Sequence, residues 1–207
     1  MNTIMRKSVL GIAGLAFAGG VFAGPATGHA APAVESAPKA VAVQADKPGI
    51  DKPGIDKPGV DKGKLIPHGV RGEQSRITLD GEQTANVKAI VAATKKAGLD
   101  ERAAVISVGT ALQESKLENL GHLGDRNDHD SLGLFQQRPS SGWGSPEQIT
   151  DPEHSTLAFL KGLKQVDGWR DMPLTEAAQT VQVSAYPDAY AQWEQQAADL
   201  VAEHWNS

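Results

Sequence analysis

Apolar side chains recur at helical spacing in four separate stretches of the chain. Positions three, four and seven residues apart lie on one face of an α-helix, so each stretch predicts a helix with one buried side. The recurring residues are Val87, Ile90, Val91 and Thr94; Val105, Val108 and Leu112; Leu157, Leu160, Leu163 and Val166; and Tyr190, Trp193, Ala197, Leu200 and His204. No stretch alternates convincingly as a strand would, so we expect an all-α domain.

Capping residues indicate where these helices begin. A carboxylate or hydroxyl before the first helical residue accepts hydrogen bonds from free backbone N–H groups, and a glutamine three positions later completes a capping box. The pattern predicts starts at Asp80, Asp100, Ser145 and Asp151, with Gln83 and Gln148 completing two boxes. The expected helices are Glu82 to Ala97, a buried central helix after Asp100 with Glu114 near its end, one after Asp151, one from about Leu174 to Ser184 and one from about Asp188 to Trp205.

Residues 1–30 carry a different pattern. Two basic residues, Arg6 and Lys7, precede an apolar run from Val9 to Ala23, and small residues surround Ala30. This order is typical of a secretory signal peptide that is removed on export. The run is short and rich in glycine, whereas a membrane-spanning helix needs about 20 strongly apolar residues. We therefore expect a secreted, extracellular protein without stable membrane insertion.

A low-complexity segment separates this signal from the helical region. DKPGI, DKPGI, DKPGV and DKGKL follow one another from Asp46 to Leu65. Pro-Gly in three of the four units interrupts helices and strands, and alternating Asp and Lys favour solvation. We interpret residues 31–70 as a linker. One folded domain is expected to begin at about Leu65 or Arg71 and to cover residues 71–207.

Composition narrows the possible partners. The chain of 207 residues has a net charge of -5, and loss of Arg6 and Lys7 with the signal lowers it to -7. An acidic protein is not expected to have nucleic acid as its main partner. The sequence contains no cysteine, so disulfides and thiolate zinc sites are excluded and the domain depends on its core. We expect a monomer without metal or cofactor.

Glu114 is the first candidate catalytic residue. The predicted helix face that leads to it is lined by small residues such as Thr110 and Ala111, so another chain segment or a ligand can approach closely. The partial negative charge of the helix C-terminus and partial burial both raise the pKa of this carboxyl. A carboxyl group that stays protonated near neutral pH suits general acid catalysis of glycoside cleavage. The alternative is a helix-end acid that pairs with Lys116 or Arg138.

The motifs around Glu114 resemble those of a known family. ES at positions 114 and 115, followed by GLFQQRP at 133–139, resembles the E-S and G-L-M-Q-x-x-P signature of lytic transglycosylases and goose-type lysozymes. AY at positions 185 and 186 resembles the third family motif, A-Y-N. Phe135 stands in place of the family's methionine, and Pro187 in place of its asparagine.

The resemblance implies a lysozyme-like fold and particular roles. Glu114 would protonate the glycosidic oxygen between N-acetylmuramic acid and N-acetylglucosamine and then act as a base. The substrate's own N-acetyl group and 6-hydroxyl would take part, leaving a 1,6-anhydro sugar. Ser115 and Gln136 would hold the sugar or the acid by hydrogen bonds. Tyr186 would hydrogen-bond near Glu114, and Gly133 would let the backbone approach the substrate closely.

The acidic loop between the two motifs admits three interpretations. Asp125, Asp128 or Asp130 could activate water as the second carboxylate of an inverting hydrolase. Asp125, Asn127 and His129 alternate like the opening of a calcium loop, but the glycine and glutamate of such a loop are missing at its sixth and twelfth positions. Asp-turns and pairing with a neighbouring arginine would instead make it a solvated structural loop.

Trp143 lies between two glycines just after the GLFQQRP motif. Its indole could stack on a sugar ring or fill the core beneath the loop. Our leading hypothesis is a secreted lytic transglycosylase that acts on the glycan strands of peptidoglycan. The rival hypotheses are an inverting muramidase with a loop aspartate as base, and a peptidoglycan-binding or interaction module without turnover.

Overall fold

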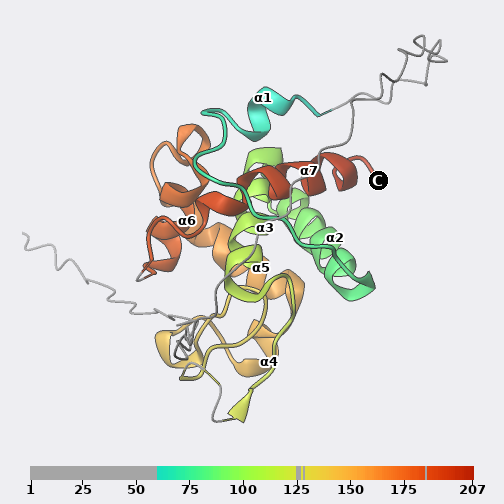
Figure 1. The fold of residues 1–207 in the computed structure, drawn as a ribbon. Coiled ribbons are helices and arrows are strands. Elements are labelled where there is room, and N and C mark those ends of the chain that lie inside the picture. Colours follow the sequence, from blue (N-terminus) through green and yellow to red (C-terminus); the bar gives the residue numbers. More distant parts are fainter. Residues whose placement is uncertain (1–59, 125–126, 128, 185) are drawn as a thin grey trace, which may run out of the picture. The chain divides into compact units, whose positions relative to one another are not determined.

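The computed structural model describes residues 60–124, 127, 129–184 and 186–207. These residues form helices joined by loops and include no strand, which confirms the all-α prediction for this part of the chain. None of these helices has the length and apolar character needed to cross a membrane. The predicted signal peptide and most of the linker lie outside the described residues. The helices are α1 (Lys62–Leu65), α2 (Gly81–Lys96), α3 (Glu101–Ser115), η2 (Pro139–Ser141), α4 (Pro146–Ile149), α5 (Pro152–Leu163), η3 (Trp169–Asp171), α6 (Leu174–Gln182), η4 (Ala191–Trp193) and α7 (Glu194–His204), where η marks a 3-10 turn (Figure 1).

α3 is the central helix and contacts α1, α2, α5, α6 and α7. Its residues from Ala103 to Leu112 are all buried. Leu174 of α6 approaches Gly109 so closely that a Cβ there would lie 2.5 Å from a leucine methyl group. The buried hydroxyls of Ser107 and Thr110 donate to the carbonyls four residues earlier. The small residues of α3 therefore admit neighbouring helices rather than a ligand.

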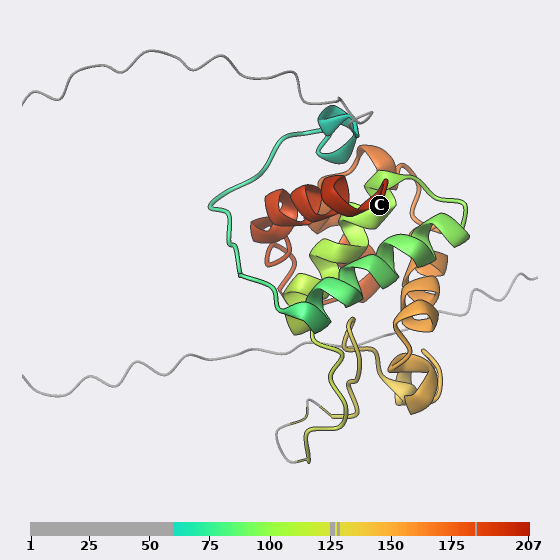
Figure 2. The same ribbon diagram turned by 90° about the vertical axis from the view of Figure 1, so that its right-hand side faces the viewer.

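α1 lies beside the N-terminal end of α3, and α4 and the loop that follows α3 lie toward its other end (Figure 2). The loop is fastened to the helices by its own apolar and polar side chains. Phe135 stacks on Phe159 of α5 with the ring centroids 5.0 Å apart. The Asn119 amide donates to the Thr150 carbonyl at 2.7 Å, and the buried Gln137 amide donates to the Ser155 carbonyl at 3.2 Å. α4 and α5 therefore hold the loop at the end of α3 that carries Glu114.

The predicted helix starts are confirmed. Asp80, Asp100, Ser145 and Asp151 each cap a helix with a side-chain oxygen, and Gln83 and Gln148 complete two capping boxes. The predicted start of the last helix, near Asp188, is wrong. Residues 186–189 form a turn closed by a hydrogen bond from the Ala189 N–H to the Tyr186 carbonyl, and η4 follows. α7 therefore begins only at Glu194.

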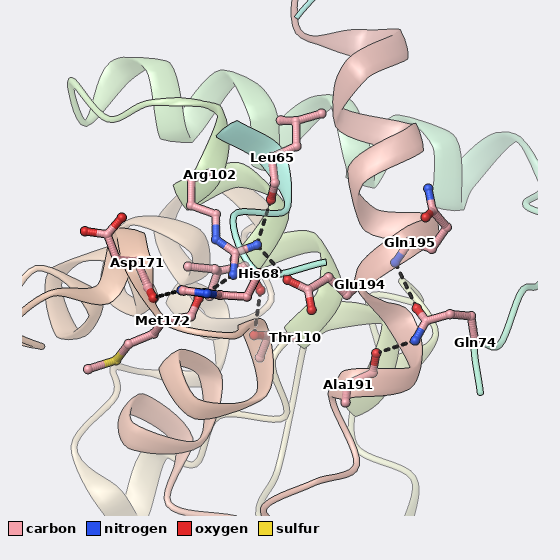
Figure 3. Close-up of polar contacts among 11 residues, drawn as sticks. Leu65, His68, Gln74, Arg102, Thr110, Asp171, Met172, Ala191, Glu194 and Gln195 are labelled. Atoms are coloured by element: carbon pink, nitrogen blue, oxygen red, sulfur yellow. Dashed lines mark hydrogen bonds and ion pairs between the residues drawn. The ribbon is translucent and has the colours of Figure 1, made fainter. Parts of the chain in front are cut away.

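Of the two predicted starts of the folded domain, Leu65 agrees with the structure, and Arg71 lies too late in the chain. Leu65 is 1% exposed and belongs to the core. Its carbonyl accepts a hydrogen bond from Arg102 of α3 at 2.7 Å. The same buried guanidinium pairs with Glu194 of α7 at 2.9 Å and donates to the Met172 carbonyl at 2.6 Å (Figure 3). This cluster therefore joins α1, α3, α7 and the segment before α6.

The last four residues of the final repeat unit, DKGKL, form α1. Gly63 occupies the position that proline holds in the three preceding units, so a helical turn becomes possible. After α1 the chain passes along the start of α7, as Figure 3 shows. There the Gln74 side chain accepts from the Gln195 N–H at 3.0 Å and donates to the Ala191 carbonyl at 3.1 Å. The N-terminal segment thus supplies a cap that α7 lacks in its own sequence.

Candidate active site

Glu114 lies on the last turn of α3, and the residue as a whole is partly buried. The Tyr190 hydroxyl donates to Oε1 of Glu114 at 2.6 Å, and the Gln182 amide donates to the same oxygen at 3.4 Å. Burial raises the pKa of Glu114, and the hydrogen bonds from Tyr190 and Gln182, with the charge of Lys116, only partly offset this rise. Burial therefore favours the protonated form of the Glu114 carboxyl group.

Tyr190 supplies the contact that was predicted for Tyr186. The Tyr190 side chain is fully buried, and burial together with the neighbouring Glu114 raises its pKa, so its hydroxyl keeps its proton at neutral pH. Tyr186 is instead 46% exposed, and its backbone N–H binds the Ser184 hydroxyl. The prediction was wrong because the chain makes a turn after α6, so the tyrosine that reaches α3 comes four residues later.

The backbone that leaves α3 is held by two polar side chains of α2. Lys116 and Leu117 both have positive φ angles, 57° and 66°, so the chain turns sharply directly after Ser115. The Gln83 amide donates to the Lys116 carbonyl at 2.8 Å, and the Asn86 amide donates to the Leu117 carbonyl at 2.9 Å. These bonds satisfy carbonyls that have no partner within α3 and fix the helix end that carries Glu114.

Ser115 has a structural role rather than the predicted contact with the sugar or the acid. Its side chain is buried, and its hydroxyl donates to the Leu134 carbonyl at 2.9 Å. The same hydroxyl also lies 3.2 Å from the Ala111 carbonyl of its own helix, and the shorter bond, to Leu134, fastens the GLFQQRP motif to the end of α3. The motif therefore lies beside Glu114 because a side chain next to that residue holds it there.

Gly133 permits a close approach, but by the protein itself and not by a substrate as predicted. Its φ angle is 70°, and a Cβ at this position would lie 2.3 Å from the Ile149 carbonyl oxygen. Gln136 also has a positive φ angle, 46°, and its amide donates back to the Gly133 carbonyl at 3.1 Å. In this structure both residues shape the turn after α3, and the substrate contact of Gln136 stays a prediction.

Asp130 is the one candidate second acid among the described residues, since Asp125 and Asp128 lie outside them. One of its oxygens accepts from the Arg138 guanidinium and the Ser140 hydroxyl, both at 2.9 Å, and the other accepts from the Ser140 N–H at 2.7 Å. The hydrogen bonds from Ser140 and Arg138 lower the pKa of Asp130 to about 2. A carboxylate with so low a pKa is a weak proton acceptor at neutral pH, so Asp130 serves mainly to close the loop.

Two further predictions concern sugar stacking and metals. Trp143 is partly buried in the bend after η2, so both interpretations of its indole stay open. Among the described residues, no group of three or more histidine, aspartate or glutamate side chains could hold a metal ion. A surface depression over α4 and α5 contains none of the predicted site residues; its lining includes Glu147, Gln148, Asp151, Glu153, His154 and Leu157.

Two residues of the site, Gln182 and Tyr190, were not predicted from the sequence. Gln182 contacts Glu114 and also donates to the Phe135 carbonyl at 2.9 Å, so it joins α6 to the loop. Tyr190 was assigned to the apolar stripe of the last helix. One signal could have found it, because a buried tyrosine hydroxyl requires a hydrogen-bond partner. Nothing in the local sequence around Gln182 indicates that it reaches the end of α3.

The sequence was compared with known protein families and with curated proteins. No known protein family matches the chain, and no curated protein matches it. The chemistry of the site therefore has to be inferred from its own residues. A desolvated carboxyl group, with fixed donors on one oxygen, can deliver a proton from the other oxygen.

Proposed function

We propose that this protein is a secreted lytic transglycosylase. It would cleave the β-1,4 bond between N-acetylmuramic acid and N-acetylglucosamine in the glycan strands of peptidoglycan. The observation that carries this proposal is Glu114, a carboxyl group whose burial raises its pKa and whose position is fixed by Tyr190. The ES and GLFQQRP motifs, which lie against each other through Ser115, support the same chemistry.

The first step is proton transfer from Glu114 to the glycosidic oxygen. Tyr190 and Gln182 both donate to Oε1, so this oxygen acts as an acceptor and the proton of the neutral carboxyl resides on Oε2. Oε2 would face the substrate and protonate the leaving oxygen as the bond to the anomeric carbon breaks. The resulting carboxylate keeps the Tyr190 hydrogen bond, which stabilises the charged form better than the neutral form.

The second step returns the proton. The Glu114 carboxylate would remove the proton from the 6-hydroxyl of N-acetylmuramic acid, whose oxygen closes the 1,6-anhydro ring at the anomeric carbon. A single residue can serve as acid and then base because the first step leaves it ionised. The other described acid of the loop, Asp130, is held by Arg138 and Ser140, which favours this route over one with Asp130 as the base for water.

The test is digestion of purified peptidoglycan followed by mass spectrometry of the released fragments. The wild-type protein would be compared with Glu114→Gln and with Glu118→Gln, a matched control at an exposed glutamate four residues away. We expect anhydro-muropeptides from the wild type and from the control, and at least about 100-fold less product from Glu114→Gln.

Other products would lead to other conclusions. Fragments with free reducing ends would identify a muramidase that uses water. Binding to cell walls without any product would identify a non-catalytic module. Equal activity of Glu114→Gln and the wild type would refute the assignment of Glu114.

A further inference from the structure

The loop between α6 and η4 begins and ends at the candidate acid. Gln182, the last residue of α6, and Tyr190, directly before η4, both donate to Oε1 of Glu114. The loop between them is thus flanked on both sides by a residue that bonds to one carboxyl oxygen. Its two ends therefore lie beside Glu114.

The described part of this loop is fastened at several points, Ala185 being outside the description. The Gln179 amide of α6 donates to the Ser184 carbonyl at 2.7 Å. The Thr175 hydroxyl donates to the carbonyl of Pro187 at 2.6 Å. Pro187 is the residue at which the chain departs from the family's third motif, and here its carbonyl anchors the loop to the start of α6. The backbone is therefore held at Ser184 and Pro187, while the side chains of Val183 and Tyr186 are exposed.

Large apolar side chains concentrate on this loop. Val183 is 53% exposed and Tyr186 is 46% exposed, and they are two of the four exposed large hydrophobic residues in the described part of the chain. Val183 also has a φ angle of 54°, a conformation that a β-branched residue rarely adopts and that glycine usually supplies at a helix end. An exposed valine gains little packing in return. Valine at this position is therefore less favourable for the stability of the folded state than glycine would be.

We propose that Val183 and Tyr186 form an apolar ledge against which a sugar ring of the glycan packs while its glycosidic oxygen reaches Glu114. This inference rests on the proposed function and assigns one part of its substrate site. Pyranose rings present C–H groups on their faces, which pack on apolar and aromatic side chains, and the tyrosine hydroxyl can also hydrogen-bond. Two side chains are far too small a surface for a stable protein partner, which needs about 800 Å² on each side.

The test measures binding separately from cleavage. The full-length Glu114→Gln protein, which would not consume the ligand, is titrated by calorimetry with soluble uncrosslinked glycan strands. Adding Tyr186→Ala should weaken the affinity about tenfold, whereas Tyr186→Phe should stay within about twofold because the ring is kept. Val183→Gly should also weaken binding while raising the melting temperature, because it relieves the unfavourable φ angle. Val70→Ala is the control, because Val70 is 41% exposed on a different segment.

The outcomes distinguish this inference from the proposed function. In the protein that retains Glu114, Tyr186→Ala should raise KM about tenfold with kcat nearly unchanged, since it removes binding and leaves the acid intact. If the wild type cleaves peptidoglycan but Tyr186→Ala binds glycan as tightly as Val70→Ala does, the ledge is refuted and the function stands. If the wild type neither cleaves nor binds glycan, the proposed function fails, and the ledge fails with it.

Discussion

The hydroxyl of Tyr190 lies 2.6 Å from Oε1 of Glu114, although 76 positions separate the two residues in the chain. Contact between them requires that α3, the turn before α7 and the loop after α6 all be correctly packed. Glu114 is therefore positioned by the tertiary structure and not by its own helix alone. Two predictions follow from the energetics of this contact.

Replacing Tyr190 with phenylalanine should shift the pH dependence of activity. The Tyr190 hydrogen bond lowers the pKa of Glu114, so its loss leaves the effect of burial less opposed and the pKa rises further. The basic limb of the kcat/KM profile should move to higher pH, because the acid stays protonated longer. Loss of positioning should also reduce kcat/KM about tenfold at the optimum. Ser207→Ala removes a hydroxyl that donates to the His204 carbonyl beyond the end of α7 and should leave the profile unchanged; a shift in both variants would contradict the assignment.

Replacing Glu114 with glutamine should stabilise the protein above the ordinary pKa of a glutamate. Because burial raises the pKa of Glu114, the folded state binds its proton more tightly than the unfolded state does. The contribution of Glu114 to stability is thus fully present below the unfolded pKa and is lost as the pH rises through the folded pKa. Urea midpoints should fall more between pH 5 and pH 8 for the wild type than for Glu114→Gln. Glu118→Gln should behave like the wild type, and parallel curves for all three proteins would contradict the prediction.

Asp130 provides a test between the two cleavage mechanisms. If it closes the loop, as its bonds to Arg138 and Ser140 indicate, Asp130→Asn should reduce activity by less than about tenfold, because the amide keeps the shape and one acceptor oxygen. If it activated water, the loss would be about 100-fold to 10,000-fold. Initial rates on purified peptidoglycan decide between these values. A loss of the larger size, with an unchanged melting temperature, would favour hydrolysis.

The local parts of this fold were predictable, because a helix cap depends on residues within a few positions. Asp80 and Ser145 illustrate this, since each accepts the backbone N–H three residues later, as its motif indicates. The start of α7 was not predictable in this way. Tyr190 and Trp193 continue the apolar periodicity of α7 backwards into the preceding turn, and periodicity alone does not distinguish a helix from a 3-10 turn.

The candidate site was predicted in part, for a related reason. Glu114 and the GLFQQRP motif could be found because each is contiguous in the sequence. The roles of Ser115 and Gly133 could not, because they depend on which backbone carbonyl lies opposite each residue. For Ser115 this is the Leu134 carbonyl and for Gly133 the Ile149 carbonyl. Such pairings are set by tertiary packing, and the residue types alone are equally compatible with substrate contacts.

Substitution by alanine should destabilise the protein more at Gly133 than at Gly98 or Gly121. Its φ angle is unfavourable for alanine, and the added Cβ would meet the Ile149 carbonyl at 2.3 Å. We expect Gly133→Ala to reduce the free energy of unfolding by about 3 kcal/mol or more. Gly98→Ala should lose about 1 kcal/mol, since Gly98 has a similar φ angle of 69° but open space around it, and Gly121→Ala should be nearly neutral. Urea unfolding provides these values, and equal losses at Gly98 and Gly133 would contradict the close approach.

Removing one partner of the buried ion pair between Arg102 and Glu194 should strongly destabilise the protein. Their side chains are 3% and 2% exposed, so Arg102→Met would leave the Glu194 carboxylate buried without its partner. We expect a loss of about 3 to 5 kcal/mol in the free energy of unfolding. The double variant Arg102→Met with Glu194→Leu should recover at least about 1 kcal/mol, because no uncompensated charge remains.

An exposed pair of the same residue types provides the control. Arg71 and Glu176 lie 3.0 Å apart with both side chains 54% exposed, and Arg71→Met should change stability by less than about 1 kcal/mol. Guanidinium unfolding of the three variants measures the differences. If the double variant were no more stable than Arg102→Met, the loss would come from the bonds of Arg102 to the Leu65 and Met172 carbonyls. Arg102 would then stabilise the fold mainly by joining α1 to α3, and not by neutralising Glu194.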